Sequence, residues 1–194
     1  LFPLKIKLWK KIMIEKIKIS LSLKENSLSI KYFIFLMALA FIFSLGVRYI
    51  WVDNFKTQEI YQWNNELMIN TNDGYYFAEG ARDILQNKNE PNDLSPIESP
   101  LAQLTATLAK IIPFISFETL ILWMPGVFGA LLVVPIMLIA REIKQDMLGF
   151  FAALLGGIAV SYYNRTMIGY YDTDFFIVLL PALMIWGGDL CPKQ

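Results

Sequence analysis

The sequence contains no histidine, and its only cysteine is Cys191. A single cysteine excludes a disulfide bond within the chain. Without histidine, the chain itself holds no serine–histidine pair, no histidine–zinc site and no histidine acid–base catalyst. Basic and acidic residues number 17 each, so the formal net charge is zero, and no overall basic signature predicts a nucleic-acid partner. Any chemistry in the chain therefore rests on carboxylates, on arginine or lysine, on tyrosine, or on a metal ion.

Long apolar runs dominate what is present, and 56% of the 194 residues are hydrophobic. Runs of this length are typical of helices that cross a bilayer. We predict an all-α multispanning membrane protein, with kinks in the second span at Pro125 and Pro135. The spans are expected at residues 32–52, 119–140, 147–163 and, incompletely, 175–186.

The polar segments complete the organisation. Residues 1–30 form a lysine-rich tail, and residues 53–117 form a long first loop that is expected to be helical. In this loop we predict a helix over 75–85, and a second that begins at Ser95-Pro96 and lies along the membrane surface. The chain begins with Leu1 and its last apolar run is short of the ~20 residues of a span. We therefore expect a partly non-native tail before Met13 and an interrupted span before the tail 187–194.

Charge placement predicts the orientation of these segments. The lysine-rich tail and the turn at 141–146 are separated by two spans and must share one side, which the positive-inside rule makes the cytoplasm. The loop at 53–117 and the stretch at 161–174 then lie outside. Arg48 is expected to anchor the outer end of the first span at the interface. Four charged residues far apart in sequence should share one extracytoplasmic face: Asp73, Arg165, Asp172 and Asp174.

These charged residues have both structural and chemical explanations. Asp172 and Asp174 form a D-x-D pair, which suits Mg²⁺ or Mn²⁺ if both carboxylates lie on a loop, but N-capping of the last span also explains it. Asp73 is equally suited to capping the helix at 75–85. Arg165 is placed to pair with Asp172 or Asp174, to bind a phosphate, or to reach the interface as an isolated arginine.

Four segments carry a family resemblance. They are INTNDGYYFAEGARDIL at 69–85, PNDLS at 91–95, VVPIMLIARE at 133–142 and SYYNRTMIGYYDTD at 161–174. In this order they resemble the N-terminal part of the PglB-like bacterial oligosaccharyltransferases, which are related to the catalytic subunit of the eukaryotic complex. The resemblance covers residues 31–186. It implies a GT-C type transmembrane glycosyltransferase that moves an oligosaccharide from a polyprenyl diphosphate to the asparagine amide of an Asn-x-Ser/Thr acceptor.

The resemblance also implies roles for individual residues. Asp73, Asp172 and Arg165 would be catalytic. Asp73 and Asp172 would bind a divalent metal, Mn²⁺ or Mg²⁺, and Asp73 would also meet the acceptor amide. Asp174 would be a metal ligand or a supporting acid, and Arg165 would organise these carboxylates and bind substrate. The implied location is the bacterial inner membrane, in the lipid bilayer, with the active-site loops in the periplasm.

Two family elements lie beyond residue 194, a third essential acid and a WWDYG motif, so this chain is expected to be inactive alone. The alternatives are another polyprenyl-phosphosugar-dependent glycosyltransferase and a cation-binding transporter. A transporter predicts charges inside the spans, and the second and third spans have none.

Overall fold

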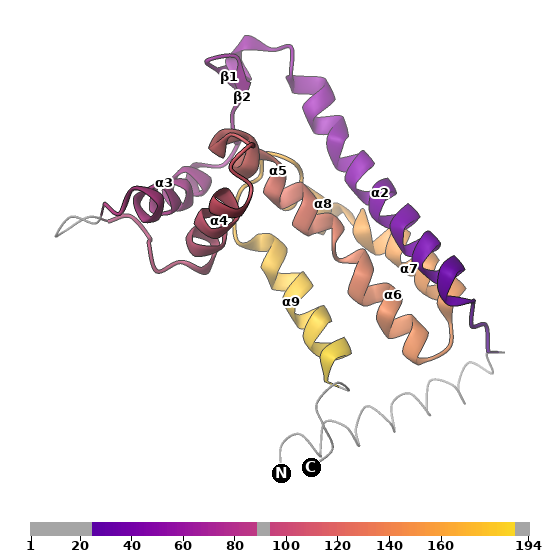
Figure 1. Ribbon diagram of the computed structural model, residues 1–194. Helices are drawn as coiled ribbons and strands as arrows, with labels where there is room; N and C mark the ends of the chain where they lie inside the picture. The colour runs from indigo at the N-terminus through magenta and orange to yellow at the C-terminus, as the bar shows by residue number, and fades with distance from the viewer. Residues whose placement is uncertain (1–24, 89–93, 189–194) are drawn as a thin grey trace, which may run out of the picture.

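The computed structural model describes residues 25–88 and 94–188. The predictions for residues 1–24, for the segment 91–93 and for most of the tail 187–194 lie outside these residues. The described part is almost entirely helical, with one two-residue hairpin (Figure 1). Its elements are α2 (Ile30–Phe55), η1 (Glu59–Tyr61), β1 (Gln62–Trp63), β2 (Glu66–Leu67), α3 (Asn72–Gln86), α4 (Pro100–Ile111), α5 (Phe117–Ala130), α6 (Val133–Glu142), α7 (Asp146–Gly157), α8 (Val160–Asn164) and α9 (Asp174–Gly187).

The apolar helices form the larger part of the molecule. Ile30–Phe55 and Phe117–Glu142 are each long and apolar enough to cross a membrane, and α7 and α9 are shorter apolar helices. The helices α2, α6 and α7 pack around Phe33, Val133 and Met137. Glycine allows close approach here, since a Cβ on Gly149 would lie 2.3 Å from the Ala140 Cβ. The arrangement agrees with the predicted all-α multispanning fold.

The second and third spans are each interrupted once. The second breaks at Leu131–Leu132, four residues before Pro135, whose ring excludes the carbonyl four positions earlier from a regular helix. Pro125 lies inside α5 without ending it. The segment predicted as the third span, 147–163, contains two helices, because α7 ends at Gly157 and α8 begins at Val160.

The first loop folds into the hairpin and the helix pair α3–α4. Thr71 rather than Asp73 caps α3, because the Thr71 hydroxyl accepts a hydrogen bond from the Gly74 amide at 3.2 Å. The predicted helix start at Ser95-Pro96 was also wrong, and α4 begins at Pro100 with Ser99 as its N-cap. A helix starting at Pro96 would have placed Pro100 in its interior, where its ring clashes and its amide donor is missing.

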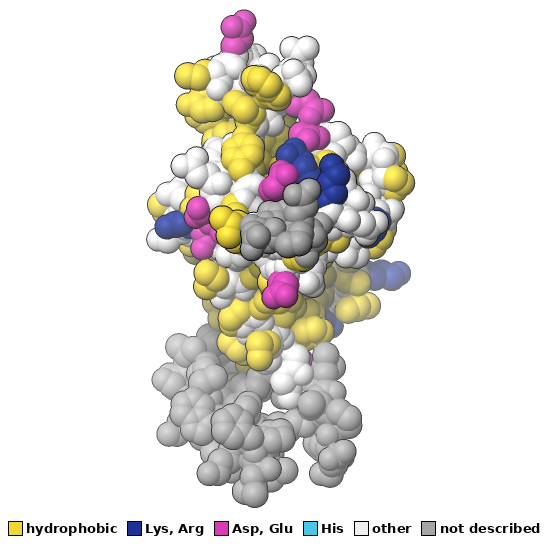
Figure 2. Space-filling model, turned by 90° about the vertical axis from the view of Figure 1, so that its left-hand side faces the viewer, with side chains coloured by type: hydrophobic (Ala, Val, Ile, Leu, Met, Phe, Trp, Pro, Cys, Tyr) yellow, Lys and Arg dark blue, Asp and Glu magenta, His cyan; other side chains and the backbone are white. Residues whose placement is uncertain are grey.

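The two ends of the bundle differ in the way the charge pattern predicted. At one end, the segment before α2 meets the turn before α7: Asn26 exchanges backbone hydrogen bonds with Lys144 and Asp146, and Arg141 pairs with buried Asp146 at 2.9 Å. Residues 25–29, which precede α2, and the turn at 141–146 therefore share one end. The helices α3 and α4 lie side by side at the other end (Figure 1). Figure 2, which faces α3 and α4, shows charged side chains of both signs over this end and a mostly hydrophobic surface below it.

Candidate functional site

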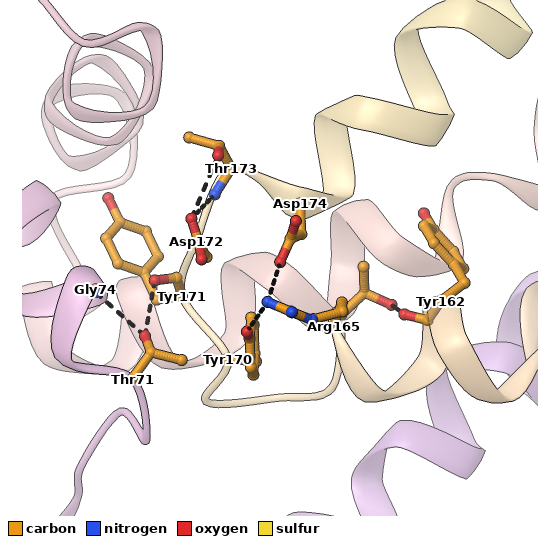
Figure 3. Close-up of polar contacts among 10 residues, drawn as sticks. Thr71, Gly74, Tyr162, Arg165, Tyr170, Tyr171, Asp172, Thr173 and Asp174 are labelled. Carbon is orange, nitrogen blue, oxygen red and sulfur yellow. Dashed lines mark hydrogen bonds and ion pairs between the residues drawn. The ribbon is translucent and has the colours of Figure 1, made fainter.

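The candidate site lies where the start of α3 meets the loop before α9. The Thr71 hydroxyl donates a hydrogen bond to the Tyr171 carbonyl at 3.0 Å (Figure 3). The Asn70 amide donates one to the Gly169 carbonyl at 2.8 Å. Gly74 allows this contact, since a Cβ there would lie 2.6 Å from the Tyr171 carbonyl oxygen. These backbone contacts bring together two segments that are 100 residues apart in sequence. We call this contact the α3–α9 junction.

The two predicted carboxylates lie within two residues of the hydrogen-bonded pair Thr71 and Tyr171. Asp73 follows Thr71 by two residues and is exposed in the first turn of α3. Asp172 directly follows Tyr171 and is half-buried, and its carboxylate accepts a hydrogen bond from the Thr173 amide at 2.6 Å. The unpaired amides and the dipole of a helix N-terminus favour a negative charge, so the first turn of α3 suits Asp73. The structure thus places both segments in one region, as the charge pattern predicted.

Arg165 resolves one of the open alternatives. Its guanidinium pairs with Asp174 at 3.2 Å and donates a hydrogen bond to the Tyr170 hydroxyl (Figure 3). The Tyr170 hydroxyl and then the Asp174 carboxylate raise the pKa of Arg165, so it stays protonated. Asp174 is the first residue of α9, so this pair joins the end of α8 to the start of α9. Its contacts with Asp174 and Tyr170 orient Arg165 within the 165–174 loop.

The carboxylates fit a divalent cation in part. Asp73 and Asp172 offer hard oxygen ligands, which Mg²⁺ and Mn²⁺ prefer, and such ions usually keep water or phosphate oxygens as further ligands. The Asp174 carboxylate is in an ion pair with Arg165. Within residues 25–88 and 94–188, no three His, Cys, Asp or Glu side chains converge on one position. The metal site and its ligands stay predictions.

Tyr171 forms a rigid base beneath the junction, a role that its local sequence does not predict. Its side chain is fully buried among Leu101, Met124 and Phe175. Its hydroxyl lies 2.5 Å from the Thr105 hydroxyl, and burial raises the pKa of Tyr171 to about 12. A buried aromatic ring with a satisfied hydroxyl resists movement, so the backbone between Tyr171 and Asp172 is firmly placed.

Arg48 was also misplaced by sequence reasoning. It was predicted to anchor the first span at the interface, but its side chain is fully buried. It donates hydrogen bonds to Ser44, Gly157 and Thr166. An arginine near the end of an apolar run has the same local sequence in both situations, so only the position of the neighbouring helices distinguishes them.

A cavity of about 700 Å³ borders the junction on the side of the hairpin. Tyr75 and Ile69 form the wall next to the start of α3, and the exposed Trp63 lies at the hairpin. Arg82 and Glu118 line the same cavity and form an ion pair at 2.8 Å. The cavity wall is therefore both aromatic and polar, and neither Asp73 nor Asp172 is among its lining residues.

Comparison with known proteins adds independent information. The family described as "Oligosaccharyl transferase STT3, N-terminal" matches residues 28–187. The undecaprenyl-diphosphooligosaccharide–protein glycotransferase of Campylobacter jejuni subsp. jejuni serotype O:2 is 47% identical over 166 residues, and that of C. jejuni strain RM1221 is 46% identical over the same length. Each match covers 84% of this chain and 23% of the relative, so the chain spans about a quarter of their length. The chain belongs to the STT3 oligosaccharyltransferase family.

Proposed function

We propose that this chain is the N-terminal part of an oligosaccharyltransferase, which transfers an oligosaccharide from a polyprenyl diphosphate to the asparagine amide of an Asn-x-Ser/Thr acceptor. Family membership and the names of the Campylobacter relatives support the reaction class. The α3–α9 junction is the observation that carries the proposal, because it brings Asp73 and Asp172 into one region across 100 residues of sequence. This placement makes them candidates for one shared catalytic site.

The chemistry of the reaction explains why acidic residues are needed. The bond between the sugar C1 and the diphosphate oxygen breaks, and its electron pair leaves with the diphosphate. A bond from C1 to the amide nitrogen forms, and the proton of that nitrogen passes to a base, either the Asp73 carboxylate or water. An amide nitrogen is a poor nucleophile because its lone pair is conjugated with the carbonyl. The Asp73 carboxylate accepts a hydrogen bond from the N–H group of the acceptor amide. This favours rotation about the amide C–N bond, which reduces the conjugation of the nitrogen lone pair with the carbonyl. Negative charge on the departing diphosphate is stabilised by cationic groups.

The other site residues have supporting roles in this proposal. Asp172 and Asp73 would hold Mn²⁺ or Mg²⁺, which when bound neutralises the charge of the diphosphate leaving group. Arg165 holds the Asp174 carboxylate, and together they fix the segment that carries Asp172. Arg165 is also exposed and permanently charged, which suits contact with a phosphate oxygen.

The proposal includes a location in the inner membrane, with the junction on the periplasmic side. Two helices of span length support membrane insertion. The shared end of residues 25–29 and the turn at 141–146 supports a cytoplasmic position for that end and a periplasmic position for α3 and α4. Transfer requires the remainder of the protein, since the relatives are about four times as long as the matched segment.

The test uses a hybrid enzyme in which residues 28–187 replace the matching segment of the Campylobacter relative. With Mn²⁺ present, Asp73→Ala and Asp172→Ala are each expected to abolish transfer of an oligosaccharide to an Asn-x-Thr peptide. Glu98→Ala is the matched control, because Glu98 is an exposed acid of the same loop that lies outside the junction. Retained transfer in both aspartate variants would overturn the assignment. Transfer to a lipid acceptor but not to the peptide would favour the alternative of another polyprenyl-linked sugar transferase.

A further inference from the structure

Arg48 is a fully buried arginine in the middle of the helix packing. Its Nε donates to the Thr166 carbonyl at 3.0 Å, and one terminal nitrogen donates to the Thr166 hydroxyl at 2.7 Å. The other terminal nitrogen donates to the Gly157 carbonyl at 2.8 Å and to the Ser44 hydroxyl at 2.7 Å. The guanidinium also lies over the Tyr162 ring, 5.5 Å from its centre. One side chain of α2 therefore joins the end of α7 to the residue that follows Arg165.

The partners of Arg48 are neutral. Among the described residues, no ion pair joins Arg48 to an aspartate or glutamate. A buried charge is costly unless hydrogen bonds satisfy it, and here backbone carbonyls and hydroxyls do so. The Gly157 carbonyl belongs to the last turn of α7, where carbonyls lack helical partners and the helix dipole is negative. Arg48 thus stabilises the break between α7 and α8.

Small residues make room for this guanidinium. A Cβ on Gly129 would lie 3.0 Å from the Arg48 Nε and 2.6 Å from the Thr166 Cβ. A Cβ on Gly157 would lie 2.9 Å from the Ser44 hydroxyl. The Tyr162 hydroxyl closes the same region by donating to the Gly129 carbonyl at 3.1 Å. The helices α2, α5, α7 and α8 therefore converge on Arg48.

Thr166 links Arg48 to the candidate site. It is buried, it directly follows Arg165, and it opens the 165–174 loop that holds Asp172 and Asp174. Two of the Arg48 hydrogen bonds end on Thr166, one on its backbone and one on its side chain. At the far end of the loop, the Thr71–Tyr171 hydrogen bond provides the other fixed point. The loop that carries the acidic residues is thus fixed at both ends.

We propose that Arg48 is a positioning residue for the transferase: from within the helix bundle it sets the place and rigidity of the 165–174 loop. The kinetic part of this inference rests on the proposed function. Lysine keeps the charge of arginine but not its planar fork of donors, so it cannot bridge Gly157 and Thr166 in the same way. Misplacing catalytic groups by about 1 Å costs on the order of 10²-fold in rate.

The experiment compares Arg48→Lys with Arg141→Lys in the hybrid enzyme. Arg141 is the matched control, because it too is an arginine bound to a buried partner, Asp146, but it lies at the opposite end of the bundle and is only partly buried. We expect Arg48→Lys to lower kcat on the order of 10²-fold with an unchanged KM for the peptide. Arg141→Lys is expected to leave kcat unchanged. Thr166→Val removes the hydroxyl partner while keeping Arg48, and it should lower kcat in the same direction.

A second measurement needs no activity. In the 194-residue chain in lipid nanodiscs, with Cys191→Ser, a nitroxide attached at Asn164→Cys reports the mobility of the segment before the loop. We expect the label to become more mobile with Arg48→Lys or Thr166→Val but not with Arg141→Lys. If Arg48→Lys fails to fold, Thr166→Val decides the question in both measurements.

The outcomes separate this inference from the proposed function. Equal kcat losses in Arg48→Lys and Arg141→Lys with unchanged nitroxide spectra would overturn the inference and leave Arg48 as a packing residue. No transfer by the hybrid with the unmodified segment would count against the proposed function, while the nitroxide spectra would still support or overturn the positioning role.

Discussion

The Thr71 hydroxyl donates to the Tyr171 carbonyl and accepts from the Gly74 amide, so one side chain both caps α3 and joins it to the loop before α9. Thr71→Val keeps the shape of the side chain and removes both hydrogen bonds. We expect it to lower the free energy of unfolding by about 1–3 kcal/mol. Hydrogen exchange at the Gly74 amide should accelerate as well.

Two controls accompany this prediction. Thr71→Ser keeps the hydroxyl and should retain most of the stability, since serine is an equally good N-cap. Thr107→Val removes an exposed hydroxyl that bonds only within α4, and it should have little effect. Equal losses in Thr71→Val and Thr107→Val, measured by denaturant unfolding in detergent, would contradict a special role for the Thr71–Tyr171 contact.

Gly74→Ala tests how closely the two segments of the junction approach. The new Cβ would lie 2.5 Å from the Thr71 hydroxyl oxygen and 2.6 Å from the Tyr171 carbonyl oxygen, so the backbone segments must separate. We expect a loss of about 1–3 kcal/mol in unfolding free energy. Gly46→Ala is the matched control in α2, because nothing lies within 4 Å of its Cβ. It should be neutral or stabilising by up to about 1 kcal/mol. If Gly74→Ala and Gly46→Ala have the same unfolding free energy, Gly74 does not lie as close to the Tyr171 carbonyl as described.

The meeting of the two acidic segments at one end of the helix bundle was predictable from sequence, and their contacts were not. Charge asymmetry and the number of spans between charged segments place Asp73 and Asp172 on one side, and this needs only a count of apolar runs. The hydrogen bond from Thr71 to Tyr171 depends on how α3 packs, which no local pattern records. The ion pair of Arg165 with Asp174 rather than Asp172 has the same origin, because both acids lie within reach in sequence.

Helix boundaries show a similar limit. Apolar composition predicted the second and third spans, and Pro135 predicted a kink near the break at Leu131–Leu132, but no pattern in the sequence predicted the break after Gly157. The misplaced start of α4 came from two consecutive Ser-Pro pairs, Ser95-Pro96 and Ser99-Pro100, each a good helix start. Only the second leaves no proline inside the helix. Arg48 illustrates a third limit. An arginine near the end of an apolar run can lie at the membrane interface or be buried between helices, and the local sequence is the same in both cases.

The Arg165–Asp174 pair is expected to matter more for activity than for stability. The Arg165 side chain is 61% exposed, and exposed ion pairs contribute about 1 kcal/mol or less. Asp174→Asn should therefore change the unfolding free energy by less than about 1 kcal/mol. In the hybrid enzyme it should lower kcat by about tenfold or more, because Arg165 loses the partner that orients it. Asp53→Asn, which breaks the exposed Lys56–Asp53 pair, is the control and should change neither. Unchanged kcat in Asp174→Asn would contradict an organising role for the pair.

The buried phenol of Tyr171 predicts a loss of stability at high pH. Burial raises its pKa from 10.0 to about 12 in the folded protein. The neutral phenol is favoured in the fold, so the folded state keeps its proton between pH 10 and 12 while the unfolded chain releases it. Stability is therefore complete below pH 10 and falls as the pH rises to 12, by up to about 3 kcal/mol from this one group.

Tyr171→Phe isolates this contribution from the other groups that titrate in the same range. The variant loses the hydrogen bond to Thr105 at every pH, but it has no phenol to ionise. Its stability should therefore approach that of the unmodified protein as the pH rises from 10 to 12, measured by denaturant unfolding at each pH. Tyr76→Phe removes an exposed phenol and should run parallel to the unmodified protein. A constant difference between Tyr171→Phe and the unmodified protein across this range would show that the Tyr171 phenol is not held in a buried, neutral state, and with it the rigid base beneath Asp172 would lose its support.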